Sequence, residues 1–187
     1  MRINLFVWII VGINLIVRIL ETILPGKTKQ KGKITAKWML TCFAVSGISV
    51  YVLGISEFVL RVKNAKIMFV VIGTVLVLIR IFLKHWATKT LGRYWSMQIE
   101  IRDDQKLITD GPYRYIRHPA YLSTLLEAVG VTIMLNAYYT LTIFCIMYLP
   151  IMIIRINLEE KELYKKFGKE FMDYRAKVPA ILPVKFL

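Results

Sequence analysis

Five apolar segments, each close to the length needed to cross a lipid bilayer, constrain this chain more than any other feature. They cover about residues 3–24, 36–60, 66–86, 120–135 and 137–158. A helical span needs roughly 20 mostly apolar residues, and within lipid an open strand would leave backbone groups without hydrogen-bond partners. Because 57% of the 187 residues are hydrophobic, no large soluble domain fits. We therefore predict an all-α polytopic membrane protein with about five transmembrane helices.

The formal charge of +14 could indicate nucleic-acid binding. The basic residues lie between the apolar segments, however, so we interpret them as signals of membrane topology. We expect no nucleic-acid partner. The positive-inside rule puts the first and third connections and the tail in the cytoplasm, with the N-terminus outside. The second connection is also basic, which runs against this order. The basic residues of the three connections are Lys27, Lys29, Lys31, Lys33 and Lys37; Arg61, Lys63 and Lys66; and Lys89, Arg93, Arg102, Lys106, Arg114 and Arg117.

The segments outside the predicted spans also have recognisable patterns. Alternation over 95–102, followed by Asp103-Asp104 and residues 106–109, predicts a short hairpin at the membrane surface. Pro150 is expected to kink the fifth span, and Asn136 to join the fourth and fifth spans in a tight helical hairpin. Apolar residues at spacings of three and four in the tail, from Leu163 to Val178, predict one interfacial C-terminal helix.

The sequence lacks the motifs of several common classes of enzyme. The ten glycines are scattered singly, so there is no G-x-G-x-x-G or phosphate-binding loop, and a Rossmann-type fold is excluded. H-E-x-x-H, C-x-x-C and G-x-S-x-G are also missing, and the two cysteines have no neighbours at metal-ligand spacing. We expect no metal site.

Polar residues concentrate in two places. The first is the run 111–121, Gly-Pro-Tyr-Arg-Tyr-Ile-Arg-His-Pro-Ala-Tyr, directly before the fourth span. It could simply start a helix, with Pro119 at its first turn and aromatic anchors in the interface. The second is the run 155–160, Arg-Ile-Asn-Leu-Glu-Glu, in which Arg155 and Glu159 share a helix face and could simply pair. Ionisable groups at the edge of a bundle otherwise indicate a ligand.

Together these runs resemble the isoprenylcysteine carboxyl methyltransferase family, whose signature is G-x-Y-x-x-x-R-H-P-x-Y followed by R-x-x-x-E-E. The similarity continues through Phe167-Gly168 and Phe171 to Tyr174 and on to Pro183, so it covers residues 95–183. Gln105 stands where the family often has His, and Ser123 where a Gly frequently follows. The short chain looks like the compact prokaryotic members of the family.

The resemblance implies a methyltransferase that uses S-adenosyl-L-methionine and a lipophilic or prenylated acceptor. It divides the single membrane domain, 1–187, into N-terminal spans (1–65) and a methyltransferase-like region (66–187) with a cytoplasmic cofactor-binding region. Arg155 and Glu159 are implied as catalytic, Arg155 as the substrate-binding residue. The implied cofactor-binding residues are Gln98, Gln105, Lys106, Leu107, Ile108, Tyr113, His118, Pro119, Ala120, Tyr121 and Glu159.

A carboxylate is the acceptor we expect, because it is ionised at neutral pH and an arginine can hold it with a bidentate hydrogen bond. An amine would have to lose a proton and would find Arg155 a poor neighbour. Phospholipid or amine N-methylation, O-methylation of a phenolic lipid, and a non-catalytic scaffold that binds membrane lipid are the alternatives.

Overall fold

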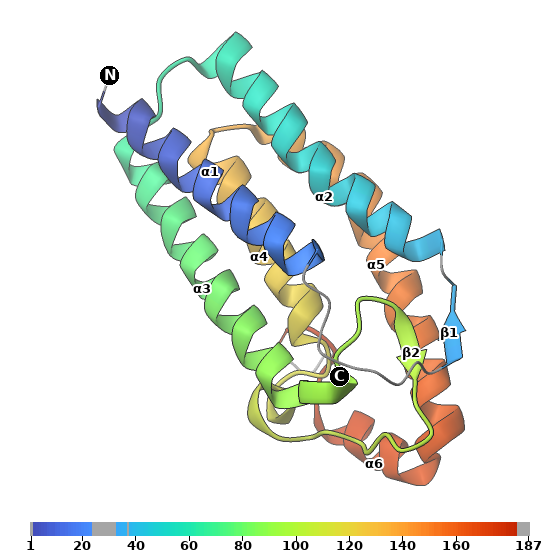
Figure 1. Ribbon diagram of the computed structural model, residues 1–187. Helices are drawn as coiled ribbons and strands as arrows, with labels where there is room; N and C mark the ends of the chain where they lie inside the picture. Colours follow the sequence, from blue (N-terminus) through green and yellow to red (C-terminus); the bar gives the residue numbers. More distant parts are fainter. Residues whose placement is uncertain (1, 24–32, 37, 183–187) are drawn as a thin grey trace.

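The computed structural model describes residues 2–23, 33–36 and 38–182, and all five predicted apolar segments form helices in it (Figure 1). Four of these helices are long and apolar enough to cross a membrane, whereas α4 has only 16 residues. A helix of that length reaches about 24 Å, less than the ~30 Å hydrocarbon layer. The helices are α1 (Arg2–Ile23), α2 (Trp38–Glu57), α3 (Ile67–Leu91), α4 (Pro119–Met134) and α5 (Tyr138–Phe167).

Large apolar side chains cover the outside of the bundle. Leu60 is 74% exposed, Ile146 70% and Phe82 65%, and many other leucines, isoleucines and valines of the long helices are exposed too. Helices that are apolar all round and outward-facing match the surroundings of a membrane span. The chain is therefore an integral, multi-pass membrane protein.

Helix α4 packs against α3, α5 and α2 inside the bundle. Its contact with α3 is closest where Gly73 faces Gly130, because a Cβ atom on Gly73 would lie 2.4 Å from the Gly130 carbonyl oxygen. Small residues allow such backbone approach in membrane bundles. The two glycines therefore set the distance between α3 and α4.

A buried group of charges joins four helices. The carboxylate of Glu127 on α4 accepts hydrogen bonds from Arg18 on α1 (3.1 Å), Tyr51 on α2 (2.7 Å) and Arg80 on α3 (3.2 Å). Arg80 is fully buried and also binds both carboxylate oxygens of Glu21, at 3.1 and 2.7 Å. Each charge in this group is thus met by an opposite one, as burial requires.

The end of the bundle near the N-terminus is closed by side-chain contacts with backbone. Helix α2 continues into the π-helical turn η1 (Phe58–Val62). Glu57 then caps the start of α5 by accepting hydrogen bonds from the backbone of Tyr139 (3.1 Å) and Thr140 (2.8 Å). The amide of Asn4 bonds the Lys63 carbonyl at 2.7 Å, which fixes the start of α1 to the connection between α2 and α3.

The predicted surface hairpin is wrong, although its first strand is present. Strand β2 (Ile99–Ile101) pairs antiparallel with β1 (Lys33–Thr35), in the connection between α1 and α2. A turn does follow β2, and a hydrogen bond from the backbone N–H of Gln105 to the Arg102 carbonyl (3.1 Å) closes it. Residues 106–108 form no strand along β2, and they line a cavity. Two short 3-10 helices complete this region, η2 (Gly92–Tyr94) and η3 (Gly111–Arg114).

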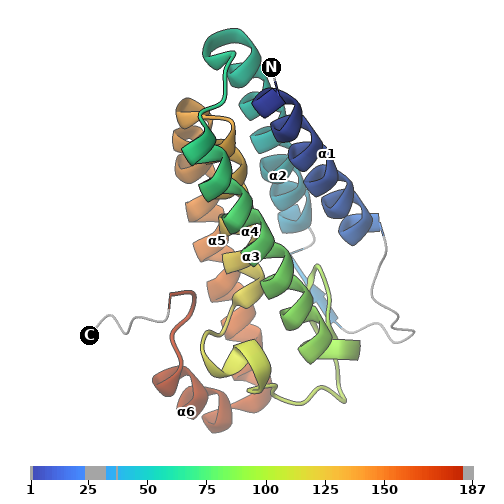
Figure 2. The ribbon, with the colours of Figure 1, turned by 90° about the vertical axis from the view of Figure 1, so that its left-hand side faces the viewer.

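The predicted interfacial helix is divided in two. Helix α5 runs through Pro150 and past the expected end of the span to Phe167, so Leu163 and Tyr164 belong to it. Gly168, with φ +52°, then turns the chain into α6 (Lys169–Lys177), which lies across the end of the bundle (Figure 2). A left-handed backbone of this kind favours glycine and ends the helix. The tight turn at Asn136 is as predicted. Among the residues named above, Leu24, Lys27, Lys29, Lys31, Lys37 and Pro183 lie outside the described part of the chain.

We predict that Gly73→Ala destabilises the fold whereas Gly12→Ala does not. Alanine favours a helix over glycine by about 1 kcal/mol, so both changes gain the same local term. At Gly73 the new methyl group collides with α4, while at Gly12 no atom lies within 4 Å. The expected net loss at Gly73 is ~1 to 3 kcal/mol, measured by thermal unfolding of both variants in detergent. Equal midpoints for the two variants would contradict the close packing of α3 on α4.

Candidate active site

A cavity of about 980 Å³ opens at the end of the bundle where β2, η3 and the start of α4 meet the last turns of α5. It continues between the apolar faces of α1 and α2, where Leu15, Ile19, Ile48 and Val52 line it. All twelve site residues expected from the sequence line this one cavity: Gln98, Gln105, Lys106, Leu107, Ile108, Tyr113, His118, Pro119, Ala120, Tyr121, Arg155 and Glu159.

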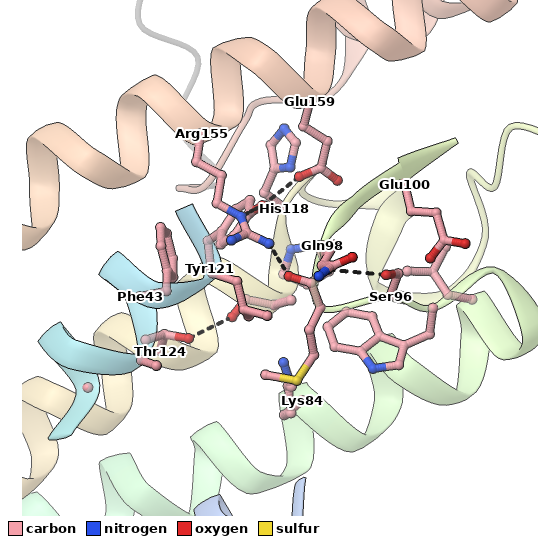
Figure 3. Close-up of a pocket in the computed structure, with 18 of the residues that line it drawn as sticks. Phe43, Lys84, Ser96, Gln98, Glu100, His118, Tyr121, Thr124, Arg155 and Glu159 are labelled. Atoms are coloured by element: carbon pink, nitrogen blue, oxygen red, sulfur yellow. Dashed lines mark hydrogen bonds between the residues drawn. The ribbon is translucent and has the colours of Figure 1, made fainter. Parts of the chain in front are cut away.

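The hydroxyl group of Tyr121 connects the two expected catalytic residues (Figure 3). It donates a hydrogen bond to Glu159 Oε2 at 2.6 Å and accepts one from Arg155 Nε at 2.8 Å. Their spacing along the helix had allowed Arg155 and Glu159 to form a direct ion pair. In the structure they are instead linked through Tyr121. The other oxygen of Glu159 makes no hydrogen bond to a described residue, so it can accept one from a ligand.

The guanidinium of Arg155 is held in place by the surrounding structure. One terminal nitrogen donates to the Met97 carbonyl, and the guanidinium carbon lies 4.6 Å from the centre of the Phe43 ring. Arg155 is only 5% exposed. Its remaining terminal nitrogen has no hydrogen bond to any residue in the described ranges, which leaves the two N–H groups of that nitrogen for a ligand.

Glu160 fixes the ring of His118 and joins three elements. Its Oε1 lies 3.0 Å from His118 Nε2 and 2.8 Å from an Arg117 terminal nitrogen, and its Oε2 lies 3.3 Å from Arg175 on α6. The backbone amides of Arg117 and His118 bond the carbonyls of Pro179 and Ala180, both at 2.9 Å. The tail after α6 thus holds the start of α4, and the imidazole of His118 is committed to a structural partner.

Two tyrosines extend this packing at the end of the bundle that carries α6. Tyr174 on α6 donates a hydrogen bond at 2.6 Å to the carbonyl of Tyr113, which lies in η3. Burial raises the pKa of the Tyr113 phenol, with a further contribution from the negative charge of Glu159. Burial also raises the pKa of Tyr174 to about 12. Both phenols are therefore neutral at physiological pH, and Tyr113 faces the cavity as a hydrogen-bond donor.

The connection after β2 contributes the remaining expected residues. The side-chain oxygen of Gln105 accepts a hydrogen bond from the Arg102 amide at 3.2 Å, so it stabilises the turn. The backbone N–H of Gln98 donates a hydrogen bond to the Ser96 hydroxyl at 3.1 Å.

Sequence reasoning missed the part of the cavity that comes from the first three spans. Phe43 on α2 packs against Arg155 and, at 5.8 Å between ring centroids, against Tyr121. Lys84 on α3 also lines the cavity. A lysine within an apolar span was a signal for Lys84, whereas an aromatic residue in a span carries none.

Comparisons with known proteins show what this chain is similar to. Residues 70–165 match the model of the isoprenylcysteine carboxyl methyltransferase (ICMT) family. A probable protein-S-isoprenylcysteine O-methyltransferase of Oryza sativa subsp. indica is 36% identical over 114 residues, 60% of each chain. The uncharacterized protein YpbQ of Bacillus subtilis (strain 168) is 26% identical over 165 residues, which is 83% of this chain and 95% of that protein.

The fold is similar to that of a solved structure, the eukaryotic intramembrane Ras methyltransferase ICMT, with a TM-score of 0.65 and 24% sequence identity. The match covers 77% of this chain and 52% of the solved one. The chain thus spans about half of that protein and three-fifths of the rice protein. Since the family model matches half of the chain and includes both polar runs, the chain belongs to the isoprenylcysteine carboxyl methyltransferase family.

Proposed function

We propose that the protein is an S-adenosylmethionine-dependent methyltransferase that methylates the carboxylate of a lipid-tailed acceptor, such as an isoprenylcysteine. The observation that carries this proposal is the single cavity in which Arg155 and Glu159, joined through Tyr121, face a space continued by the apolar walls of α1 and α2. A polar end and an apolar end in one cavity suit a small polar donor and an acceptor with a lipid tail.

The residues present fit the donor. Its ammonium group needs an acceptor, and Glu159 has one carboxylate oxygen without a described partner. Tyr113, Pro119 and Ala120 offer apolar surface beside it, and the main chain at Leu107 and Ile108 lies at the cavity wall, available for the adenine. When bound, S-adenosylmethionine supplies a methyl group on a positively charged sulfur, which an anionic oxygen can attack.

The protein's own contribution is then mainly positioning in a poorly hydrated site. A carboxylate with a pKa near ~3.5 is already ionised, so no general base is required. Arg155 orients this carboxylate through the terminal nitrogen that Met97 and Tyr121 leave open. Phe43 keeps the guanidinium plane fixed while the acceptor enters from the side of α1 and α2.

The orientation that fits this proposal has the cavity mouth, α6 and the C-terminal end in the cytoplasm and the N-terminus outside. The donor is water-soluble and would enter from the cytoplasm, whereas the acceptor tail would come from the bilayer. The side of the bundle that carries α6 and β2 is opposite to the N-terminus (Figures 1 and 2).

The competing functions differ in what they would transfer or bind. Methyl transfer from labelled donor to a panel of prenylated thiols, lipophilic acids, phenols and aminolipids, catalysed by purified protein, tests the proposal. Transfer to the carboxylates supports it, whereas transfer to amines or phenols alone contradicts the choice of acceptor. A protein that binds anionic lipid but shows no saturable donor binding is a scaffold.

We predict that Glu159→Ala and His118→Ala weaken donor binding by ~1 to 3 kcal/mol, because each removes a polar partner from a buried site. Glu159 acts on the donor directly, and His118 acts through the packing that Glu160 maintains. Calorimetric titration of folded variants measures the effect. Glu162→Ala is the control, since Glu162 pairs with Lys165 in the next turn of α5 and does not line the cavity. Parent-like affinity in both variants would refute the assignment.

Tyr121→Phe is expected to lower both donor affinity and turnover. The change keeps the ring that packs on Phe43 but leaves Arg155 Nε and Glu159 without their shared partner. A hydrogen bond to a charged group contributes ~1.5 to 3 kcal/mol. Tyr164→Phe is the matched control, because Tyr164 is 52% exposed on the same helix as Arg155. If the two variants behave alike, the bridge has no functional role.

For Arg155→Lys we predict a fall in methyl transfer with nearly unchanged donor affinity, and for Arg155→Ala a larger fall. Lysine keeps the charge but cannot hold the Met97 carbonyl, Tyr121 and an acceptor at fixed angles together. Arg114→Lys, at an exposed position, serves as control. An arginine that only reaches the interface would tolerate lysine, so full turnover in the Lys variant would return Arg155 to a structural role.

A further inference from the structure

Lys84 is a cation inside the membrane bundle, and it has no role in the reaction proposed above. It lies in α3, within one of the four helices long enough to span a bilayer, and its side chain lines the cavity from the side opposite to α5 (Figure 3). A charged side chain at such a position is costly and generally has a partner or a ligand.

The charges near Lys84 already neutralise one another. One turn before it, Arg80 pairs with Glu21 at 2.7 Å and with Glu127 at 3.1 Å. Arg18 pairs with the same Glu127 at 3.1 Å. Two arginines therefore meet two glutamates, and Lys84 adds one positive charge beyond this balance.

The ammonium group of Lys84 has no anionic partner among the described residues. Its only described contact of this kind is the ring of Trp95, whose centre lies 4.2 Å from Nζ. The backbone carbonyl of Lys84 accepts a hydrogen bond from the Thr88 hydroxyl at 2.9 Å, but no described hydrogen bond or ion pair includes its ammonium group. An ammonium carries three donors, and a ring face satisfies the charge only in part. The group therefore faces the cavity with unused donors.

We propose that Lys84 binds the carboxylate of the lipophilic acceptor, together with the open terminal nitrogen of Arg155. This inference rests on the proposed function and changes one feature of it. Arg155 has only one terminal nitrogen without a described bond, so a two-bonded fork to the acceptor would have to share a nitrogen with Met97 or Tyr121. A second cation supplies a donor that is not shared. The acceptor is favoured over the donor because Lys84 comes from α3, which packs on α1, and Leu15 and Ile19 of α1 line the apolar part of the cavity, whereas the expected donor residues begin at Gln98.

The test compares binding of N-acetyl-S-farnesylcysteine with that of its carboxamide to purified full-length protein in detergent. The two probes share the tail and differ in charge, so the ratio of their affinities isolates the carboxylate. The parent should prefer the acid. Lys84→Met should reduce acid affinity about tenfold or more, the usual effect of losing a bond to a buried charge, and leave amide affinity unchanged. Lys84→Arg should restore part of the preference, and donor affinity should be the same in all variants.

Lys89→Met is the matched control, since Lys89 is exposed in the last turn of the same helix and does not line the cavity. Lys84→Gln gives a second neutral variant if the Met variant does not fold. Equal parental affinity for acid and amide, equal losses for both probes in the Lys84 variants, or a loss of donor affinity would each overturn the proposal. Because binding is measured without turnover, an acid preference that depends on Lys84 stands even if no methyl transfer occurs, and the proposed function would then fail separately.

Discussion

The arrangement of the helices depends on the hydrogen bonds that the carboxylate of Glu127 accepts. This carboxylate lies on the central helix α4 and accepts hydrogen bonds from Arg18, Tyr51 and Arg80, which belong to α1, α2 and α3. A carboxylate with no such donors would be expensive to bury in an apolar bundle. The first two helices, which lie outside the family match, are therefore attached to α4 by hydrogen bonds to a charged group as well as by packing.

This attachment explains how a cavity can persist inside a small bundle. The bonds of Glu127 hold α1, α2 and α3 to α4, while the contacts of Glu160 with Arg117, His118 and Arg175 hold the end of the bundle that carries α6. With both places fixed, the helices need not close on one another along the cavity. Tyr121, Arg155 and Glu159 form one part of the cavity wall and Lys84 another.

The sequence predicted the features that local patterns determine. Apolar length predicted the five helices, and the resemblance that the two polar runs carry predicted twelve site residues that all line one cavity. It did not predict features that depend on contacts distant in sequence. Strand β2 pairs with β1, which precedes α2, and not with the segment that follows β2. Glu159 is linked to Arg155 through Tyr121, which lies 38 residues before Glu159 in the chain. Spacing along one helix could not reveal a partner on another.

The division of labour between Arg155 and Lys84 follows from the same distinction. The motif marks Arg155 as important, yet its guanidinium spends two of three nitrogens on Met97 and Tyr121 and so acts first as an organiser of the site. Lys84 lies outside the motif and retains its donors because its neighbours are already paired with one another. If the acceptor is an anion from the bilayer, as we propose, the site needs a cation that the protein itself does not satisfy. Of the two described lysines that line this cavity, Lys106 is exposed, whereas Lys84 lies within a span.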